Sequence, residues 1–198
     1  MLDGPAREPA GPPPLSPRRY RRPRGRHLTG YVPTSPFRYS LCRDWPHGEG
    51  RVLWVMLNPS TADATQDDPT IRRCARFSRD WGYQSLEVVN LFALRATRPS
   101  DIDHFEPHTA TGGWRADEAI AEALTRCDLV VCAWGAIPRR LRVQQRDREV
   151  LDMIRAADRG MRTWPHHLGL TKDGFPRHPL YLPADSSPRL WVDEAMRR

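Results

Sequence analysis

Short apolar runs that alternate with helical patterns predict the elements of this chain. Three runs rich in Val and Leu, as expected of strands buried on both faces, cover residues 51–57, 86–91 and 128–134. Helical spacing of apolar residues predicts helices over 68–81, 114–126 and 138–157, and a short fourth strand over 161–164. Because strands that alternate with helices form parallel units, we expect an α/β three-layer sandwich with about four parallel strands.

The ends of the chain add further elements. Partial alternation over 37–45, followed by turn residues at 46–50, predicts a hairpin with the strand at 51–57, which would add an antiparallel N-terminal strand. Residues 95–113 have the composition of a loop. A last short helix is expected over 190–196. The 19 residues from Pro165 to Pro183 predict a long loop, and long loops inside compact domains usually carry function.

Charge divides the chain in two. The 198 residues carry 31 basic and 24 acidic side chains, a net charge of +7. Residues 1–27 hold seven Arg against Asp3 and Glu8, and they are also rich in Pro. We therefore expect a disordered tail over 1–27 and a single, nearly neutral α/β domain over 28–198. The tail is either an arm that contacts nucleic-acid phosphates or a segment without that role. In the second case it is a solvated extension, or it results from a wrongly assigned start codon.

Several function classes lose support from the sequence. The longest apolar runs are about six residues, whereas a membrane-spanning helix needs about 20. No Walker phosphate loop, G-x-G-x-x-G or G-x-S-x-G motif is present. The four Cys lack C-x-x-C spacing, which favours a reduced, cytoplasmic setting. Metal ligation by His104 and His108 is conceivable, but Pro107 disfavours a shared helical face, so we expect a solvated loop and no cofactor.

Candidate site residues follow the predicted strands, where the ligand crevice of a parallel sheet lies. Asn58 and Asn90 carry amides that both donate and accept, so they can hold a water or the edge of a base, although a turn or a loop contact would also explain them. His178 can donate to a developing anion or be structural, and Lys172 is either an amine nucleophile or an ordinary surface lysine. The full set is Asn58, Pro59, Ser60, Thr61, Asp63, Asn90, Arg95, Trp134, Gly135, Lys172, Arg177 and His178.

The order of motifs resembles a bacterial and phage family of unknown function. The strings that carry the resemblance are MLNPSTAD, DDPTIRRCARFSRDWGY, VVNLFALRAT and LTKDGFPRHPLYL, within residues 37–183. More remotely, the chain resembles the uracil-DNA glycosylase superfamily, because Asn58–Pro59 is similar to its first motif and His178–Pro179 to its second. That resemblance implies a uracil-DNA glycosylase-like fold with a four-stranded parallel sheet.

The glycosylase resemblance also implies roles for individual residues. Asn58 would position the attacking water, Asn90 would read the base edge, and His178 would stabilise the leaving base after the base is flipped out. Met56 departs from the family's small Gly, and Leu180 departs from its Ser, which puts the pocket width and a phosphate contact in doubt. A full hairpin of 37–45 with 51–57 would also conflict with the glycosylase strand order.

Three functions therefore stay open. The first is an enzyme that cleaves the N-glycosidic bond of a nucleobase, with DNA or a nucleotide as substrate. The second is a non-catalytic nucleic-acid-binding module, suggested by the tail and by Arg139, Arg140, Arg142, Arg146 and Arg148. The third is a small-molecule nucleotide hydrolase or transferase that uses the same crevice. We expect no membrane partner, and a monomer is favoured.

Overall fold

A computed structural model describes residues 35–60, 66–102, 105, 107–142, 144–157 and 163–192. The N-terminal tail, and Thr61 and Asp63 of the candidate site, lie outside the described residues. No described helix has the length and apolar character needed to cross a membrane.

Six strands form one mixed sheet in the order β1-β3-β2-β4-β5-β6. The neighbours β3-β2, β2-β4 and β4-β5 run parallel, whereas β1 and β6 pair antiparallel at the two edges. The sheet is therefore mixed: four strands pair in parallel, the antiparallel N-terminal strand that the sequence allowed is present as β1, and β6 adds a second antiparallel strand that was not expected. The strands are β1 (Leu41–Asp44), β2 (Arg51–Met56), β3 (Ser85–Asn90), β4 (Leu129–Cys132), β5 (Pro165–His167) and β6 (Arg189–Leu190).

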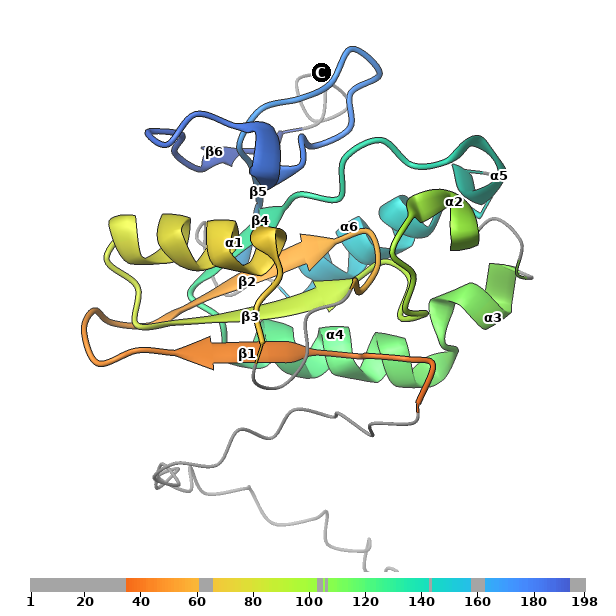
Figure 1. The fold of residues 1–198 in the computed structure, drawn as a ribbon, viewed down its shortest axis with the longest axis horizontal. Helices are drawn as coiled ribbons and strands as arrows, with labels where there is room; N and C mark the ends of the chain where they lie inside the picture. The colour runs from red at the N-terminus through yellow and green to blue at the C-terminus, as the bar shows by residue number, and fades with distance from the viewer. Residues whose placement is uncertain are drawn as a thin grey trace, which may run out of the picture.

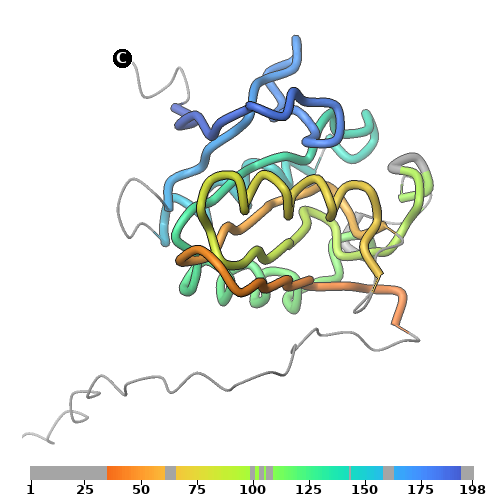
Figure 2. The backbone as a smooth tube through the Cα atoms, turned by 60° about the vertical axis from the view of Figure 1, so that its left-hand side comes forward, coloured from red at the N-terminus to blue at the C-terminus, as the bar shows by residue number. Residues whose placement is uncertain are grey.

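Helices cover both faces of this sheet (Figure 1). The helices are α1 (Pro69–Asp80), α2 (Pro99–Ile102), α3 (Pro107–Thr111), α4 (Trp114–Arg126), α5 (Arg139–Arg142), α6 (Arg146–Ala156) and the short 3-10 helix η2 (Pro179–Tyr181). One apolar cluster joins α1 to the sheet, and a second joins α4 and α6 to the opposite face. Figure 2 shows the C-terminal segment, in blue, at the β5–β6 side of the molecule. The α/β class expected from the sequence is confirmed.

Helix α1 begins and ends for the reasons that the sequence indicates. The Asp68 side chain accepts a hydrogen bond from the Ile71 N–H at 2.8 Å, and Pro69 occupies the first turn, where its missing N–H costs nothing. Gly82 follows the helix with φ of +84°. The buried face packs on the sheet, and Ser78 accepts a hydrogen bond from the Trp54 indole at 3.0 Å.

The predicted hairpin between 37–45 and 51–57 is wrong. β1 pairs with β3, where Leu41 is the partner of Val88, and β2 lies between β3 and β4. The turn after β1 crosses to the end of α1, because Trp45 and Glu49 donate backbone hydrogen bonds to Gln84 and Gly82. β2 is almost wholly apolar and buried, so it is more stable between two parallel strands than paired with an exposed edge strand. The conflict with the glycosylase strand order therefore does not arise.

Four other elements differ from the prediction. The helix expected over 138–157 is two helices, with Gln145 at φ of +51° between them. The expected loop over 95–113 contains α2 and α3. The fourth strand lies at 165–167 rather than 161–164. Residues 189–190 form β6 where a helix was expected, and residues 193–198 lie outside the described part.

One ion-pair cluster is buried in the sheet away from the candidate site. Glu87 of β3 is fully buried, and Arg126 at the end of α4 binds both of its carboxylate oxygens, at 2.7 and 2.9 Å. Arg51 approaches the same carboxylate at 3.4 Å. Burial raises the pKa of the neighbouring Cys42 thiol to about 12, and the Glu87 charge adds to this effect. Cys42 therefore stays a neutral thiol.

Candidate functional site at the carboxyl ends of the parallel strands

The loop after β2 is fixed to the loop after β3 by the Asn58 side chain. Its amide nitrogen donates to the carbonyl of Ala96 at 2.8 Å and to that of Pro59 at 3.0 Å. The Ala96 N–H donates back to the Pro59 carbonyl at 3.0 Å. No described residue donates to the Asn58 Oδ1, which leaves this oxygen as an acceptor. Asn58 is thus both a structural clasp and a source of one acceptor at the sheet edge.

Asn90 ends β3 as a buried amide. The side chain is only 4% exposed, and neither its Nδ2 nor its Oδ1 has a hydrogen-bond partner among the described residues. Asn90 is the register partner of Met56 and shares its strand face with Val88, so it points to the same side of the sheet as α1. Each buried polar group without a partner costs about 1–3 kcal/mol. A side chain kept at that cost is typical of a binding site.

The surroundings of His178 favour its neutral form. It lies at the N-terminus of η2, where its Nδ1 accepts from the Leu180 N–H at 3.4 Å. In the neutral ring the proton then sits on Nε2. Burial lowers the pKa of His178, against an opposing effect of the Asp68 carboxylate. The net effect favours the neutral imidazole, in which Nε2–H is the donor.

Gly135 brings His178 to the end of β4. Its N–H donates to the Pro176 carbonyl at 2.8 Å, so the late loop rests on the chain that leaves β4. Gly135 has φ of +73°, and a Cβ at this position would lie 3.4 Å from the His178 Cβ. The close approach and the backbone conformation both favour glycine here.

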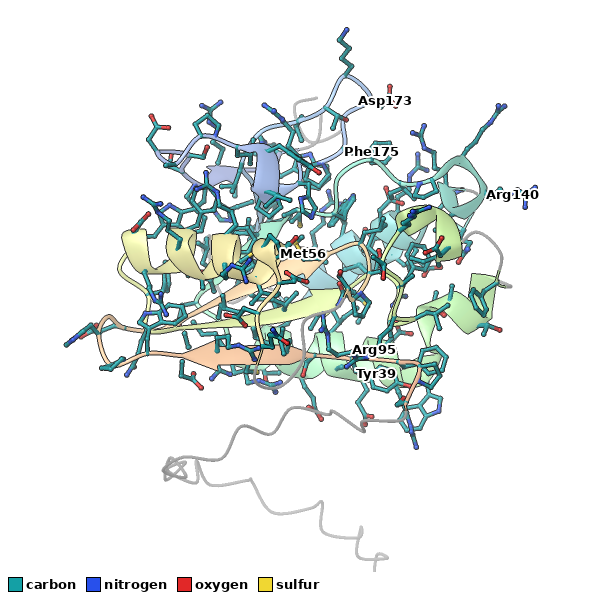
Figure 3. The ribbon with its side chains drawn as sticks, in the orientation of Figure 1. Tyr39, Met56, Arg95, Arg140, Asp173 and Phe175 are labelled. Carbon is teal, nitrogen blue, oxygen red and sulfur yellow. The ribbon has the colours of Figure 1, made fainter. Side chains whose placement is uncertain are left out.

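Asn58, Asn90 and His178 therefore lie at the same end of the sheet, where the parallel strands have their carboxyl ends; we call this the carboxyl edge. Asn58 follows β2, Asn90 ends β3, and His178 lies against Gly135, which follows β4. These strands are neighbours in the order β3-β2-β4, so β3 and β4 lie about 10 Å apart, twice the usual strand spacing. Figure 3 shows Met56 between α1 and the sheet, in the middle of this edge. The sequence prediction assigned Asp68 only a capping role and missed its electrostatic effect on His178. The Asp68–Pro69 pair carries a capping signal alone, so nothing in the sequence links it to His178.

The structure places the other candidates less centrally. Trp134 points to the opposite face, where its ring packs on Trp191 with centroids 5.6 Å apart. Lys172 is exposed at the tip of a turn, and Arg177 is exposed with its N–H on the Gly169 carbonyl at 2.8 Å. The remaining candidates that the structure describes line the loops beside the edge, namely the buried Pro59 and the half-buried Ser60 and Arg95.

The Arg-rich segment is not a free cationic face. Arg146 is 6% exposed, contacts Asp117 and Glu149, and donates to the Leu91 carbonyl at 3.1 Å. Arg142 pairs with Asp173 at 3.3 Å. Arg139 and Arg140 are exposed, and Figure 3 shows Arg140 pointing outward from the fold. The segment therefore offers fewer free charges than its sequence suggests.

The suggested metal position lies outside the described side chains, since neither His104 nor the His108 side chain is described. Within the described residues, no group of three or more His, Cys, Asp or Glu side chains could hold a metal ion.

One comparison with known proteins gives a match. A family model described as "Protein of unknown function (DUF1643)" matches residues 38–180. No curated protein and no solved structure matches the chain. The matched span runs from just before β1 into η2, so it includes Asn58, Asn90, Gly135 and His178. The likeness to the uracil-DNA glycosylases stays a prediction.

Proposed function

The chain belongs to this family of uncharacterised proteins, and from its own residues we propose that it hydrolyses the N-glycosidic bond of a nucleobase in DNA. The observation that carries the proposal is the Asn90 amide, which is 4% exposed and has two polar atoms without described partners. One donor beside one acceptor matches the donor–acceptor edge of a base. A base flipped out of the duplex would satisfy both atoms at once.

His178 supports the departure of the base. Cleavage leaves the bonding electron pair on the base nitrogen, and negative charge spreads to the carbonyl oxygens of the base. A neutral Nε2–H can donate to such an oxygen, and a donor fixed in advance stabilises charge that develops in the transition state. The lowered pKa of His178 favours the neutral form that this role requires.

Asn58 supports the attack of water. Its amide nitrogen is held by two backbone carbonyls, so Oδ1 is fixed and can accept a hydrogen bond from the water. The water oxygen bonds to the sugar carbon as the bond to the base breaks. The hydroxyl stays on the sugar, and the second water proton ends on the released base, so no side chain needs to keep a proton.

The test is a cleavage panel. Duplex and single-stranded oligonucleotides that carry uracil, mispairs or modified bases, together with free nucleosides, are incubated with the wild-type chain and scored for abasic sites or released base. We expect Asn90→Leu, Asn58→Ala and His178→Phe to lose at least tenfold in rate, in the range of removed transition-state contacts. Lys172→Ala is the matched control and should cleave like wild type, because its side chain lies at an exposed turn.

Each contrary outcome points elsewhere. Release from nucleosides but not from oligonucleotides would indicate the small-molecule hydrolase. Binding of DNA without product on any substrate would indicate the non-catalytic module. Loss of activity in Lys172→Ala, together with borohydride trapping of the wild-type chain on its substrate, would indicate an amine nucleophile instead of water.

A further inference from the structure

A concave surface lies at the amino-terminal ends of the parallel strands, opposite to the candidate site. This groove, which we call the amino-end groove, has a volume of about 480 Å³ and is lined by Trp45, Pro46, Gly48, Arg79, Gly82 and Tyr83, with His47 beside them. It is built by the turn between β1 and β2 and by the end of α1, at the left of Figure 1. β2 separates it from the candidate site by about 20 Å, the length of six strand residues. The proposed hydrolysis does not use it.

The groove is aromatic and held rigidly. The Trp45 indole donates to the Tyr83 carbonyl at 2.7 Å, which fixes the ring. The Arg79 guanidinium lies over the same ring, 4.7 Å from its centroid. Grooves lined by fixed Trp and Tyr rings are the usual receptors for Pro-rich segments in the polyproline II conformation. Such segments lose little entropy on binding, and Pro rings pack well on aromatic faces.

Acidic side chains flank the groove. Asp44 precedes Trp45, Glu49 follows Gly48, and Asp80 lies next to Arg79; all three are exposed. No described residue pairs with the Glu49 carboxylate. A Pro-rich ligand followed by basic residues would therefore find carboxylates beside the aromatic surface.

The chain itself carries such a ligand. Residues 14–19 read Pro-Leu-Ser-Pro-Arg-Arg, a Pro-x-x-Pro sequence followed directly by two Arg. Seventeen residues lie between Pro17 and Ser35, where the described structure begins, and this stretch can span about 60 Å. The ten residues from Ser35 to Trp45 span at most about 35 Å. The segment is therefore long enough to reach the groove.

We propose that the amino-end groove binds residues 14–19 of the same chain. Docking holds the N-terminal arm at the turn between β1 and β2. This proposal is independent of the proposed hydrolysis, since it concerns a different edge of the fold.

The test uses the full-length chain and follows the indole N–H signal of Trp45 in a nitrogen–proton NMR spectrum. This signal is identified by its loss in Trp45→Phe. Pro14→Ala/Pro17→Ala should shift this signal, because the docked rings leave the groove. Pro5→Ala/Pro9→Ala is the matched control and should leave it in place. A peptide of residues 11–20 should shift the signal of the Pro14→Ala/Pro17→Ala chain back to the wild-type position. The same peptide should bind the wild-type chain about tenfold more weakly, as expected for competition with a tethered segment.

Three results would overturn the proposal. The first is an identical Trp45 signal in the wild-type chain and in Pro14→Ala/Pro17→Ala. The second is peptide binding of equal strength to both chains, which would leave the groove open to Pro-rich segments of other proteins. The third is a wild-type signal that moves towards the variant position on dilution, which would mean that the arm docks on a second copy.

Discussion

The buried amide of Asn90 predicts a variant that gains stability while it loses function. In Asn90→Leu, two polar atoms with no described partner are replaced by methyl groups on a side chain with the same branching. The folded chain no longer bears the cost of an unsatisfied amide, about 1–3 kcal/mol for each group. The larger methyl groups must be fitted in the core, which costs about 1–3 kcal/mol. We expect a net rise of about 1–3 kcal/mol in the free energy of unfolding.

The matched variant is Asn58→Leu, whose effect has the opposite sign. The Asn58 amide donates two hydrogen bonds, at 2.8 and 3.0 Å, and its loss leaves the Ala96 and Pro59 carbonyls without that donor. We expect a fall of about 1–3 kcal/mol in the free energy of unfolding. The two asparagines therefore separate a structural amide from one kept for a ligand, although both lie at the same sheet edge.

Urea denaturation followed by circular dichroism measures both variants, with thermal melting as a check. For a chain of this length, 1 kcal/mol corresponds to about 2–4 °C in Tm. The reasoning is refuted if Asn90→Leu is destabilised as much as Asn58→Leu. That result would mean that the Asn90 amide is already satisfied in the folded chain, and its claim to a ligand would be lost.

Three further predictions concern His178, the buried Glu87 and Gly135. Because burial lowers the pKa of His178, the unfolded chain binds more protons just below the ordinary value of 6.5. The free energy of unfolding should therefore fall as the pH drops through about 6.5. Urea denaturation at a series of pH values should show a smaller fall in His178→Gln. The same dependence on pH in the variant and in the wild-type chain would contradict this. Arg126→Met should lower the free energy of unfolding by about 3 kcal/mol in urea denaturation, because Arg51 alone then faces the buried Glu87 carboxylate. The double variant Glu87→Gln/Arg126→Met should lose less, because it buries no charge. Equal losses in the two variants would argue against a charge effect. Gly135→Ala should lower the free energy of unfolding by more than about 1–2 kcal/mol and shift the His178 imidazole signals in NMR, whereas Gly174→Ala, with a similar φ and open space around it, should show the backbone cost alone.

Local signals predicted the buried elements well. The dense apolar runs predicted β2, β3 and β4, and the cap at Asp68 with Gly82 fixed both ends of α1. Pairing between distant segments was beyond these signals, because a strand that follows a tight turn has the same pattern whether it forms a hairpin or crosses to another strand. The missed break at Gln145 has a similar origin, since helical spacing continues through the left-handed residue.

The candidate site was predictable in its location but not in its chemistry. The apolar runs placed Asn58, Asn90 and Gly135 at the carboxyl ends of β2, β3 and β4, where the structure has them; that a ligand binds there stays a prediction. The sequence could not distinguish the two amides, because only the surrounding backbone decides which one is satisfied. It also did not place Trp134 on the far face: β4 ends at Cys132, two residues before Trp134, whose side chain joins the cluster of Val130 and Cys132.

The pairing of β1 with β3 has a consequence for how the chain folds as it is made. Leu41 pairs with Val88, so more than forty further residues must be synthesised before β1 can pair with β3. β2 waits longer for its second neighbour, since Val52 meets Leu129. Such long loops must close before the central strands are protected, which slows folding relative to a chain of hairpins. During synthesis the apolar β2 is therefore exposed until β4 has left the ribosome, and this interval is when a chaperone would bind it.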